Sequence, residues 1–138
     1  MIRTLIALSV IAVLGCAVAA EKPAKNGVAD AIAFDKADKI EVKAGKWNEP
    51  NLVTGEDDLK KLIPDEATRK RLMKEVDFKT HVLLVFVWEG SVGDKLEFAI
   101  LESFPEQVKF SLLPSGQRRN RIHIELFAVK KESRWSAK

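Results

Sequence analysis

The chain has 138 residues, a length typical of one domain, and its single cysteine, Cys16, excludes any disulfide within the chain. Its 23 Lys and Arg residues against 20 Asp and Glu residues give a net charge of +3. This charge is too small for a typical nucleic-acid-binding domain, so we expect no nucleic-acid partner.

The N-terminus has the organisation of a secretory signal peptide. Arg3 supplies a positive charge, residues 4–14 form an apolar run too short to span a bilayer comfortably, and the small residues 17–20 follow. This order predicts a signal peptide over residues 1–20, cleaved after Ala19 or Ala20. We therefore expect a protein exported to the periplasm or secreted.

A second interpretation of the same segment is lipidation. Residues 13–16 read Val-Leu-Gly-Cys, which resembles the lipobox of bacterial lipoproteins. Cys16 would then be acylated and become the first residue of the mature chain. In that case a lipid anchor would be the protein's contact with a membrane.

The mature chain begins with a polar segment and continues into one domain. Residues 21–37 predict a flexible leader, as is common next to a terminus. The single domain is then expected over residues 38–138. Apolar and charged residues alternate over residues 38–46, which predicts its first strand.

Two short helices are expected next. Thr54 and Asp57 have the spacing of a capping box, which predicts a helix over residues 56–63. Pro64 ends that helix, and Asp65 is placed to cap a second one over residues 66–75. The carboxylates at the start of the first helix are explained by capping, so no catalytic role is assigned to them.

The strongest structural signal is the apolar run at residues 82–88. Its β-branched and aromatic composition predicts a strand buried on both faces. Alternating apolar residues over 96–100, 108–112 and 122–128 predict three further strands.

The alternation also predicts how these strands pair. Ile100 would lie opposite Val108, and Val108 opposite Leu126, so that the apolar residues share one face. The same register brings Lys109 opposite Glu125 on the outer face. The predicted fold class is α+β: an antiparallel meander sheet of about five strands, with a helical pair inserted after the first strand.

The sequence contains no catalytic or metal-binding signature. His81 precedes the buried strand, His123 is expected on the outer face of the last strand, and neither belongs to an H-x-x-H pattern. Ser91 lies in a hairpin tip rather than in G-x-S-x-G. We expect no catalytic residue, no metal and no cofactor.

The segment 117–121 carries three arginines in five residues, at Arg118, Arg119 and Arg121. Strand alternation places His123 on the side of Arg119 and Arg121. Because guanidinium groups bind carboxylate and phosphate in a bidentate manner, these three arginines and His123 form the hypothetical ligand-binding set. The alternative is a solvated loop that opposes edge pairing and aids solubility.

A resemblance to known proteins rests on Val76-Asp77-Phe78, the run at 82–85 and Gly90. Over residues 76–113 the chain resembles small exported bacterial domains of unassigned function, and it is faintly similar to the domain of bacterial protease-complex stability proteins. The Gly-Gly-Tyr hairpin of that family is replaced by Gly-Ser-Val-Gly at residues 90–93, and the chain has no tyrosine. No functional residue is carried over.

The function expected from the sequence is an exported, non-enzymatic interaction domain whose partner is a protein or an anionic envelope component. One alternative is a module that binds polyanions or membrane surfaces through the basic loop 117–121. A second alternative is a small envelope hydrolase, which requires His81 or His123 to meet an acid and a hydroxyl group in a cleft.

Overall fold

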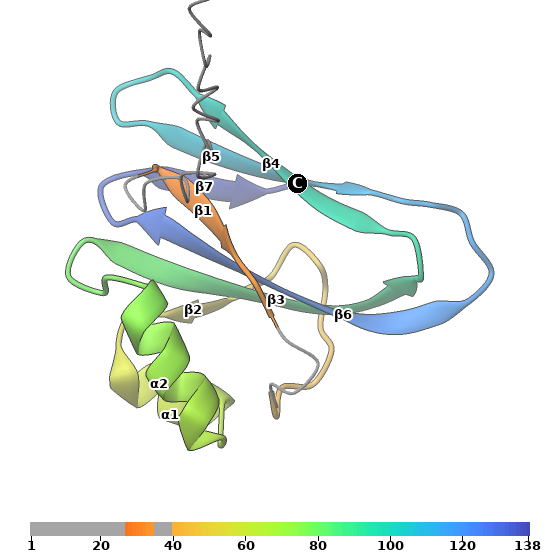
Figure 1. Ribbon diagram of the computed structural model, residues 1–138. Coiled ribbons are helices and arrows are strands. Elements are labelled where there is room, and N and C mark those ends of the chain that lie inside the picture. The colour runs from red at the N-terminus through yellow and green to blue at the C-terminus, as the bar shows by residue number, and fades with distance from the viewer. Residues whose placement is uncertain (1–26, 35–39) are drawn as a thin grey trace, which may run out of the picture.

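The computed structural model describes residues 27–34 and 40–138 (Figure 1). The expected signal peptide and Cys16 lie outside the described residues. Seven strands and two helices occur within the described part of the chain. In chain order they are β1 (Ala29–Ile32), β2 (Asn51–Val53), α1 (Glu56–Leu62), α2 (Glu66–Glu75), β3 (His81–Ser91), β4 (Lys95–Leu101), β5 (Gln107–Leu113), β6 (Asn120–Lys130) and β7 (Arg134–Ala137).

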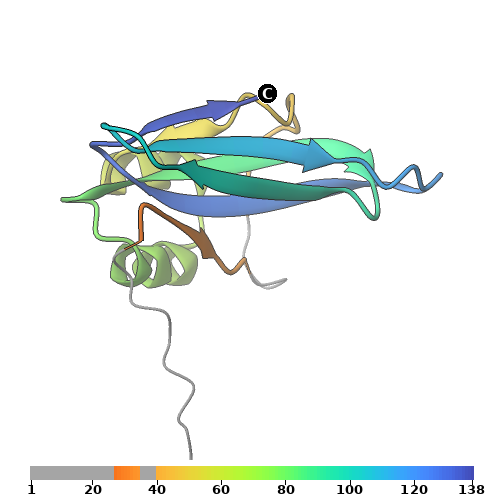
Figure 2. The ribbon, with the colours of Figure 1, turned by 90° about the horizontal axis from the view of Figure 1, so that it is seen from above.

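The strands form two sheets rather than one. The large sheet has the order β1-β6-β3-β2, and the small sheet has the order β4-β5-β7. The small sheet covers one face of the large sheet, and the helices lie against the other face (Figures 1 and 2). The class α+β is therefore correct, whereas the single five-stranded meander is wrong.

β3 is an inner strand of the large sheet with both faces covered, as its apolar run predicts. Alternate side chains enter two different cores. Those that contact the small sheet are Leu84, Phe86 and Trp88, and those on the helix side are Leu83, Val85 and Val87. Between the sheets the core is aromatic: the rings of Phe86 and Phe110 lie 4.9 Å apart.

Both helices form close to their predicted ranges, and α2 has the predicted bounds. Asp65 caps α2 by accepting a hydrogen bond from the backbone N–H of Thr68 at 2.8 Å. At α1 the predicted capping box is wrong, because the N-cap is Gly55 and no described side chain caps the helix. Asp58, not Asp57, contacts Thr54: its Oδ2 accepts from the Thr54 backbone N–H at 3.0 Å and from its hydroxyl at 2.8 Å.

The predicted strand register is correct for one hairpin and wrong for the next. Ile100 lies opposite Val108 in the β4–β5 pair, as predicted. β6, however, pairs along its whole length with β3, and β7 occupies the second edge of β5 in parallel. Lys109 is therefore opposite Ala99 and Ser136, not Glu125. The physical reason is that β6 buries apolar residues on both faces, which requires the middle layer.

The boundary of the domain also differs from the expectation. Residues 29–32 of the expected leader form β1 and pair with β6, so the large sheet begins before residue 38. Within the expected strand at 38–46, residues 40–44 form no ladder, and Gly45 makes a single bridge to Trp88. The alternation there has a different origin, because Ile40 and Val42 pack against the helix-side core.

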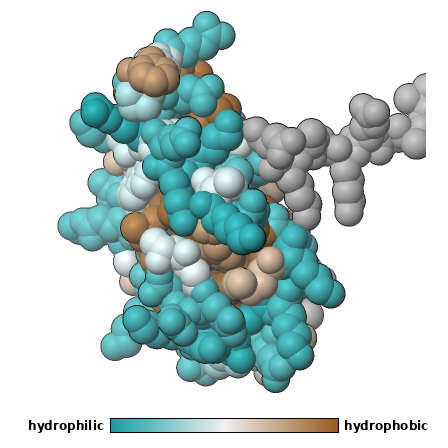
Figure 3. Space-filling model, turned by 90° about the vertical axis from the view of Figure 1, so that its left-hand side faces the viewer, coloured by the Kyte–Doolittle hydropathy of each residue, from teal (hydrophilic) through white to brown (hydrophobic). Residues whose placement is uncertain are grey.

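The end of the small sheet at the β4–β5 turn carries exposed apolar side chains. Phe104 is fully exposed, and Ile100, Leu101 and Trp135 are between 36% and 45% exposed. Figure 3 shows apolar side chains at the top of this side of the molecule, where β4 turns into β5. No pattern in the sequence predicts this surface.

Candidate functional site

Two connections lie side by side at the opposite end of the sheets, on the right of Figure 1. We call residues 91–94 and 114–121 the loop end. The backbone N–H of Val92 donates to the carbonyl of Arg119 at 2.7 Å, which joins the β3–β4 turn to the β5–β6 loop. The hypothetical arginine set belongs to the second of these connections.

A buried carboxylate holds the two connections together. Asp94 accepts from the backbone N–H of Ser91 through Oδ2 at 2.9 Å and from that of Ser115 through Oδ1 at 2.8 Å. The hydrogen bond from Ser115 is the main reason that the pKa of Asp94 lies below its ordinary value, and the bond from Ser91 and the nearby His123 act in the same direction. The loop is thus fixed at its base by a group that stays ionised at neutral pH.

The loop presents Arg118, Arg119 and Arg121 to solvent. Among the described residues none of the three forms a salt bridge, whereas four basic residues of the helices pair with acids one turn away: Lys60, Lys61, Lys70 and Arg71. The loop is therefore basic and exposed, as predicted. Its three guanidinium groups have no acidic partner at salt-bridge distance among the described residues.

His123 does not join that surface. It is only 3% exposed, its Nε2 lies 2.8 Å from the carbonyl oxygen of Ser91, and its ring stacks on Trp88. The predicted place on the outer face of the last strand is wrong, because pairing with β3 turns this side of β6 toward the small sheet. The indole Nε1 of Trp88 is buried and has no hydrogen-bond partner among the described residues.

Gly90 is necessary for this packing. A Cβ atom at residue 90 would stand 2.5 Å from Oδ2 of Asp94 and 2.9 Å from Nε1 of Trp88. Both distances are below any normal carbon contact, so the glycine allows the carboxylate and the indole to approach the turn closely.

A groove runs from the loop end along β6. We call it the edge groove; its volume is about 270 Å³, and its lining consists of Phe34 and residues 121–125. Arg121 and His123 of the hypothetical set line it, whereas Arg118 and Arg119 do not. The structure thus brings together one arginine of the set with the histidine, and it adds Glu125.

Glu125 is a site residue that the sequence did not reveal. Partial burial raises the pKa of its carboxyl above the ordinary value, against the opposing effects of His123, the Leu96 backbone N–H and Arg121. Alternation, which places Glu125 on the same face of the strand as His123, is the available signal, but the sequence predicts that this face is exposed to solvent. Glu125 also lines a second pocket together with Leu96, Glu97 and Phe98 of β4.

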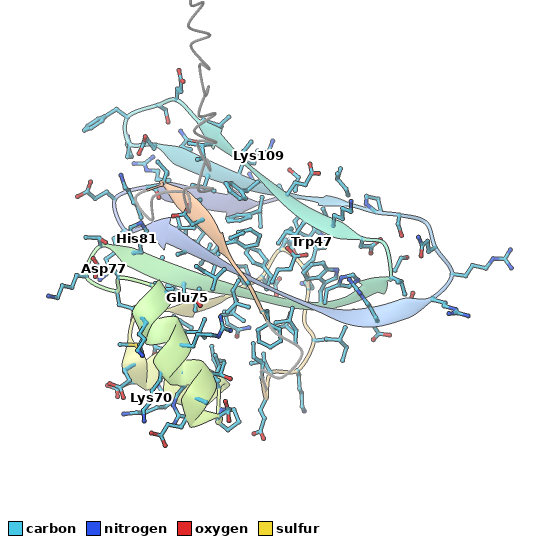
Figure 4. The ribbon with its side chains drawn as sticks, viewed as in Figure 1. Trp47, Lys70, Glu75, Asp77, His81 and Lys109 are labelled. Atoms are coloured by element: carbon cyan, nitrogen blue, oxygen red, sulfur yellow. The ribbon has the colours of Figure 1, made fainter. Side chains whose placement is uncertain are left out.

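His81 lies at the other end of the molecule, near Asp77 (Figure 4). The hydroxyl of Thr80 lies 3.1 Å from Oδ2 of Asp77 and 2.7 Å from Nδ1 of His81, and Nε2 of His81 lies 3.2 Å from the carbonyl oxygen of Gly27. An acid, a hydroxyl and a histidine do meet here, in the turn before β3. The adjacent groove is lined by residues 73–79 and by neither Thr80 nor His81.

Within residues 27–34 and 40–138, no cluster of three or more histidine, cysteine or acidic side chains has the arrangement of a metal site. None of the helices in this part of the chain has the length and apolar character that a membrane span requires.

Comparison of the chain with models of protein families, with characterised proteins and with solved structures gives no match. The similarity to the protease-complex stability domain therefore stays a prediction.

Proposed function

We propose that this protein is an exported, non-enzymatic binding domain that takes an anionic partner at its loop end. The observation that carries the proposal is the set of three exposed arginines that form no salt bridge with any described residue, on a loop whose base is fixed by Asp94. Such groups favour a carboxylate, sulfate or phosphate ligand.

The anchoring of the loop supports binding as its role. Ordering a flexible loop on association consumes part of the interaction energy, and a loop that is already held avoids that loss. Here Ser115, next to the start of the loop, and Arg119, near its end, are hydrogen-bonded to the β3–β4 turn. The guanidinium groups are therefore presented from a fixed base.

The absence of a catalytic role in this proposal follows from the positions of the histidines. His123 is buried under the small sheet, and the ring nitrogens of His81 both contact internal groups. A small envelope hydrolase would need one of them open to a cleft beside a nucleophile.

Export is the second part of the proposal, and it rests on residues 1–20. Mass spectrometry of the protein from its host is expected to show a chain that starts at Ala20 or Glu21, or an acylated Cys16. An intact Met1 in a cytosolic fraction would remove this part of the proposal.

Titration with heparin tests the binding. We expect the protein to bind heparin at low salt and to lose affinity as salt rises, because exposed charges are screened. The variant Arg118/Arg119/Arg121→Ser should bind far more weakly. The variant Lys131/Arg134/Lys138→Ser, which removes the same charge from exposed positions around β7, is the matched control and should bind nearly as well as the wild type.

Equal weakening in both triple variants would mean that net charge alone drives the binding, and equal binding by the wild type and the arginine variant would leave the loop as a solvated tip. Anionic vesicles, titrated in parallel, distinguish a membrane surface from a soluble polyanion or acidic protein.

A further inference from the structure

β6 is a long strand with an edge that is only partly covered. It pairs with β3 at every position from Asn120 to Lys130, but β1 pairs only with residues 126–129 (Figure 2). Among the described residues, the segment 120–125 therefore has a strand on one side only. An edge of this kind presents unpaired backbone N–H and C=O groups that can receive another strand.

The hydrogen bonds at the two ends of β6 identify which residues face that edge. The carbonyl of Arg119 accepts from Val92 on the β3 side, and the N–H of Lys130 donates to Val28 on the β1 side. Because backbone groups alternate along an antiparallel strand, even-numbered residues of β6 direct theirs toward β1. Ile122 and Ile124 thus direct their backbone groups toward the uncovered edge.

The edge groove follows the same line. It is lined by five consecutive residues, 121–125, although neighbouring side chains of a strand point to opposite faces. A groove that contacts all five therefore runs along the edge of the strand and not over one face. Phe34, just beyond β1, closes it at the end where β1 stops.

The side chains along this edge have a definite pattern. Ile122 is 60% exposed on the helix-side face, and Arg121 is exposed on the other face, next to Arg119 and Arg118. On a strand added at this edge, an apolar residue is favoured opposite Ile122 and an acidic residue is favoured opposite Arg121. The positive charge of the loop end lies at the end of the groove farthest from β1.

The geometry points to β-strand addition: the edge of β6 from Asn120 to Glu125 receives an extended acidic peptide segment of a partner protein, which continues the line of β1. This inference rests on the proposed binding function and names its partner. The segment runs antiparallel to β6, so its apolar residue meets Ile122 and the acidic residue that follows meets Arg121. Backbone hydrogen bonds supply affinity, and the arginines select the acidic sequence.

The test uses a synthetic fluorescent peptide in which valine alternates with threonine and the last two residues are glutamate. We expect binding by fluorescence anisotropy that weakens as salt rises. The variant Ile122→Pro removes an edge N–H while leaving the β3 side of the ladder intact, since proline is tolerated at edge positions. It should bind about tenfold more weakly or worse, whereas Ile122→Thr, which retains the N–H, is the matched control.

A second arm leaves the protein unchanged, so a misfolded proline variant cannot decide the result. The same peptide with N-methyl groups on alternate backbone nitrogens, on the side that would face β6, should lose binding, and the peptide methylated on the opposite nitrogens should keep it. Equal binding of the two methylated peptides, or no binding of the parent peptide, would overturn strand addition.

The outcomes separate this inference from the proposed function. One outcome is that heparin binding depends on the arginines, while peptide binding is unaffected by Ile122→Pro and by methylation of the peptide. The loop would then bind anions, and the edge would receive no strand. If neither ligand depends on the arginines, the proposed function itself fails. A wild-type dimer that Ile122→Pro converts to a monomer would show that a second copy takes the edge, which also overturns the inference.

Discussion

The indole ring of Trp88 and the imidazole ring of His123 stack face to face, with 4.6 Å between their centroids and 8° between their planes. The two residues lie directly opposite each other in the β3–β6 pair, and both are buried. The contact fixes the end of the large sheet that supports the loop end, because Nε2 of His123 also lies within hydrogen-bond distance of the Ser91 carbonyl.

Loss of that ring should destabilise the domain. For His123→Ala we expect a decrease of about 2–4 kcal/mol in the free energy of unfolding, through the cavity and the unpaired carbonyl of Ser91. His123→Phe keeps a stacked ring and loses the hydrogen bond, so its decrease should be smaller. Urea denaturation measures both, and equal losses in the two variants would contradict a packing role for the stack.

Val85 tests the assignment of the central strand. It has no exposed surface, lies between β2 and β6, and packs in the helix-side core. Val85→Asp places an uncompensated charge there, which should decrease the free energy of unfolding by about 4 kcal/mol. Val85→Ala leaves only a cavity, so its melting temperature should lie between those of Val85→Asp and the wild type. A melting temperature for Val85→Asp within a few degrees of wild type would show that residue 85 is not enclosed.

We expect the stability that Asp94 contributes at the loop end to depend on pH. Its pKa is lowered in the folded protein, so ionised Asp94 contributes stability above its ordinary value near 3.8, and this contribution is lost as pH falls through the lowered pKa. In Asp94→Asn only one side-chain atom, the amide oxygen, can accept a hydrogen bond. The variant should therefore have a lower melting temperature than the wild type at pH 7. The difference from wild type should shrink at pH 3.

The control for Asp94 is Glu97→Gln, which neutralises an exposed carboxylate of β4. It should change the melting temperature little at either pH. A difference between Asp94→Asn and wild type that stays constant from pH 7 to pH 3 would argue against an anchor that depends on ionisation.

For Glu125 we expect the opposite pH dependence of stability. Burial raises its pKa in the folded protein, so the associated stability is fully present below the ordinary value near 4.5 and is lost as pH rises through the raised pKa. Glu125→Gln resembles the protonated form and should therefore melt at a higher temperature than wild type at pH 7. Near pH 4 the two proteins should converge, as measured by thermal melts at both pH values. A variant less stable than wild type at pH 7 would mean that the carboxylate is needed in its charged form.

Elements that depend on local sequence were predictable. Asp65 and Pro64 determine where α2 begins, because capping and the end of the preceding helix act within a few residues. The β4–β5 register was also predictable, since a short turn brings the two alternating runs together at once.

The arrangement of β6 required the tertiary structure. A period of two shows which side chains share a face, but it does not show which strand lies alongside or whether the second face is covered. The predicted outer face of this strand contains His123, Glu125 and, by the same alternation, Phe127, but Phe127 is buried against the small sheet. The same error makes His123 and Glu125 solvent-facing in the prediction.

The sequence by itself therefore determined the helices, the buried strand β3, the β4–β5 hairpin and the basic loop with Arg118, Arg119 and Arg121. Only the tertiary structure decided that β6 leaves β5 and pairs with β3. This pairing buries His123, partly buries Glu125 and, among the described residues, leaves residues 120–125 with a strand on one side only. The physical reason is that pairing between β3 and β6 is set by covering both of their apolar faces at once, a requirement of the whole fold that no local pattern contains.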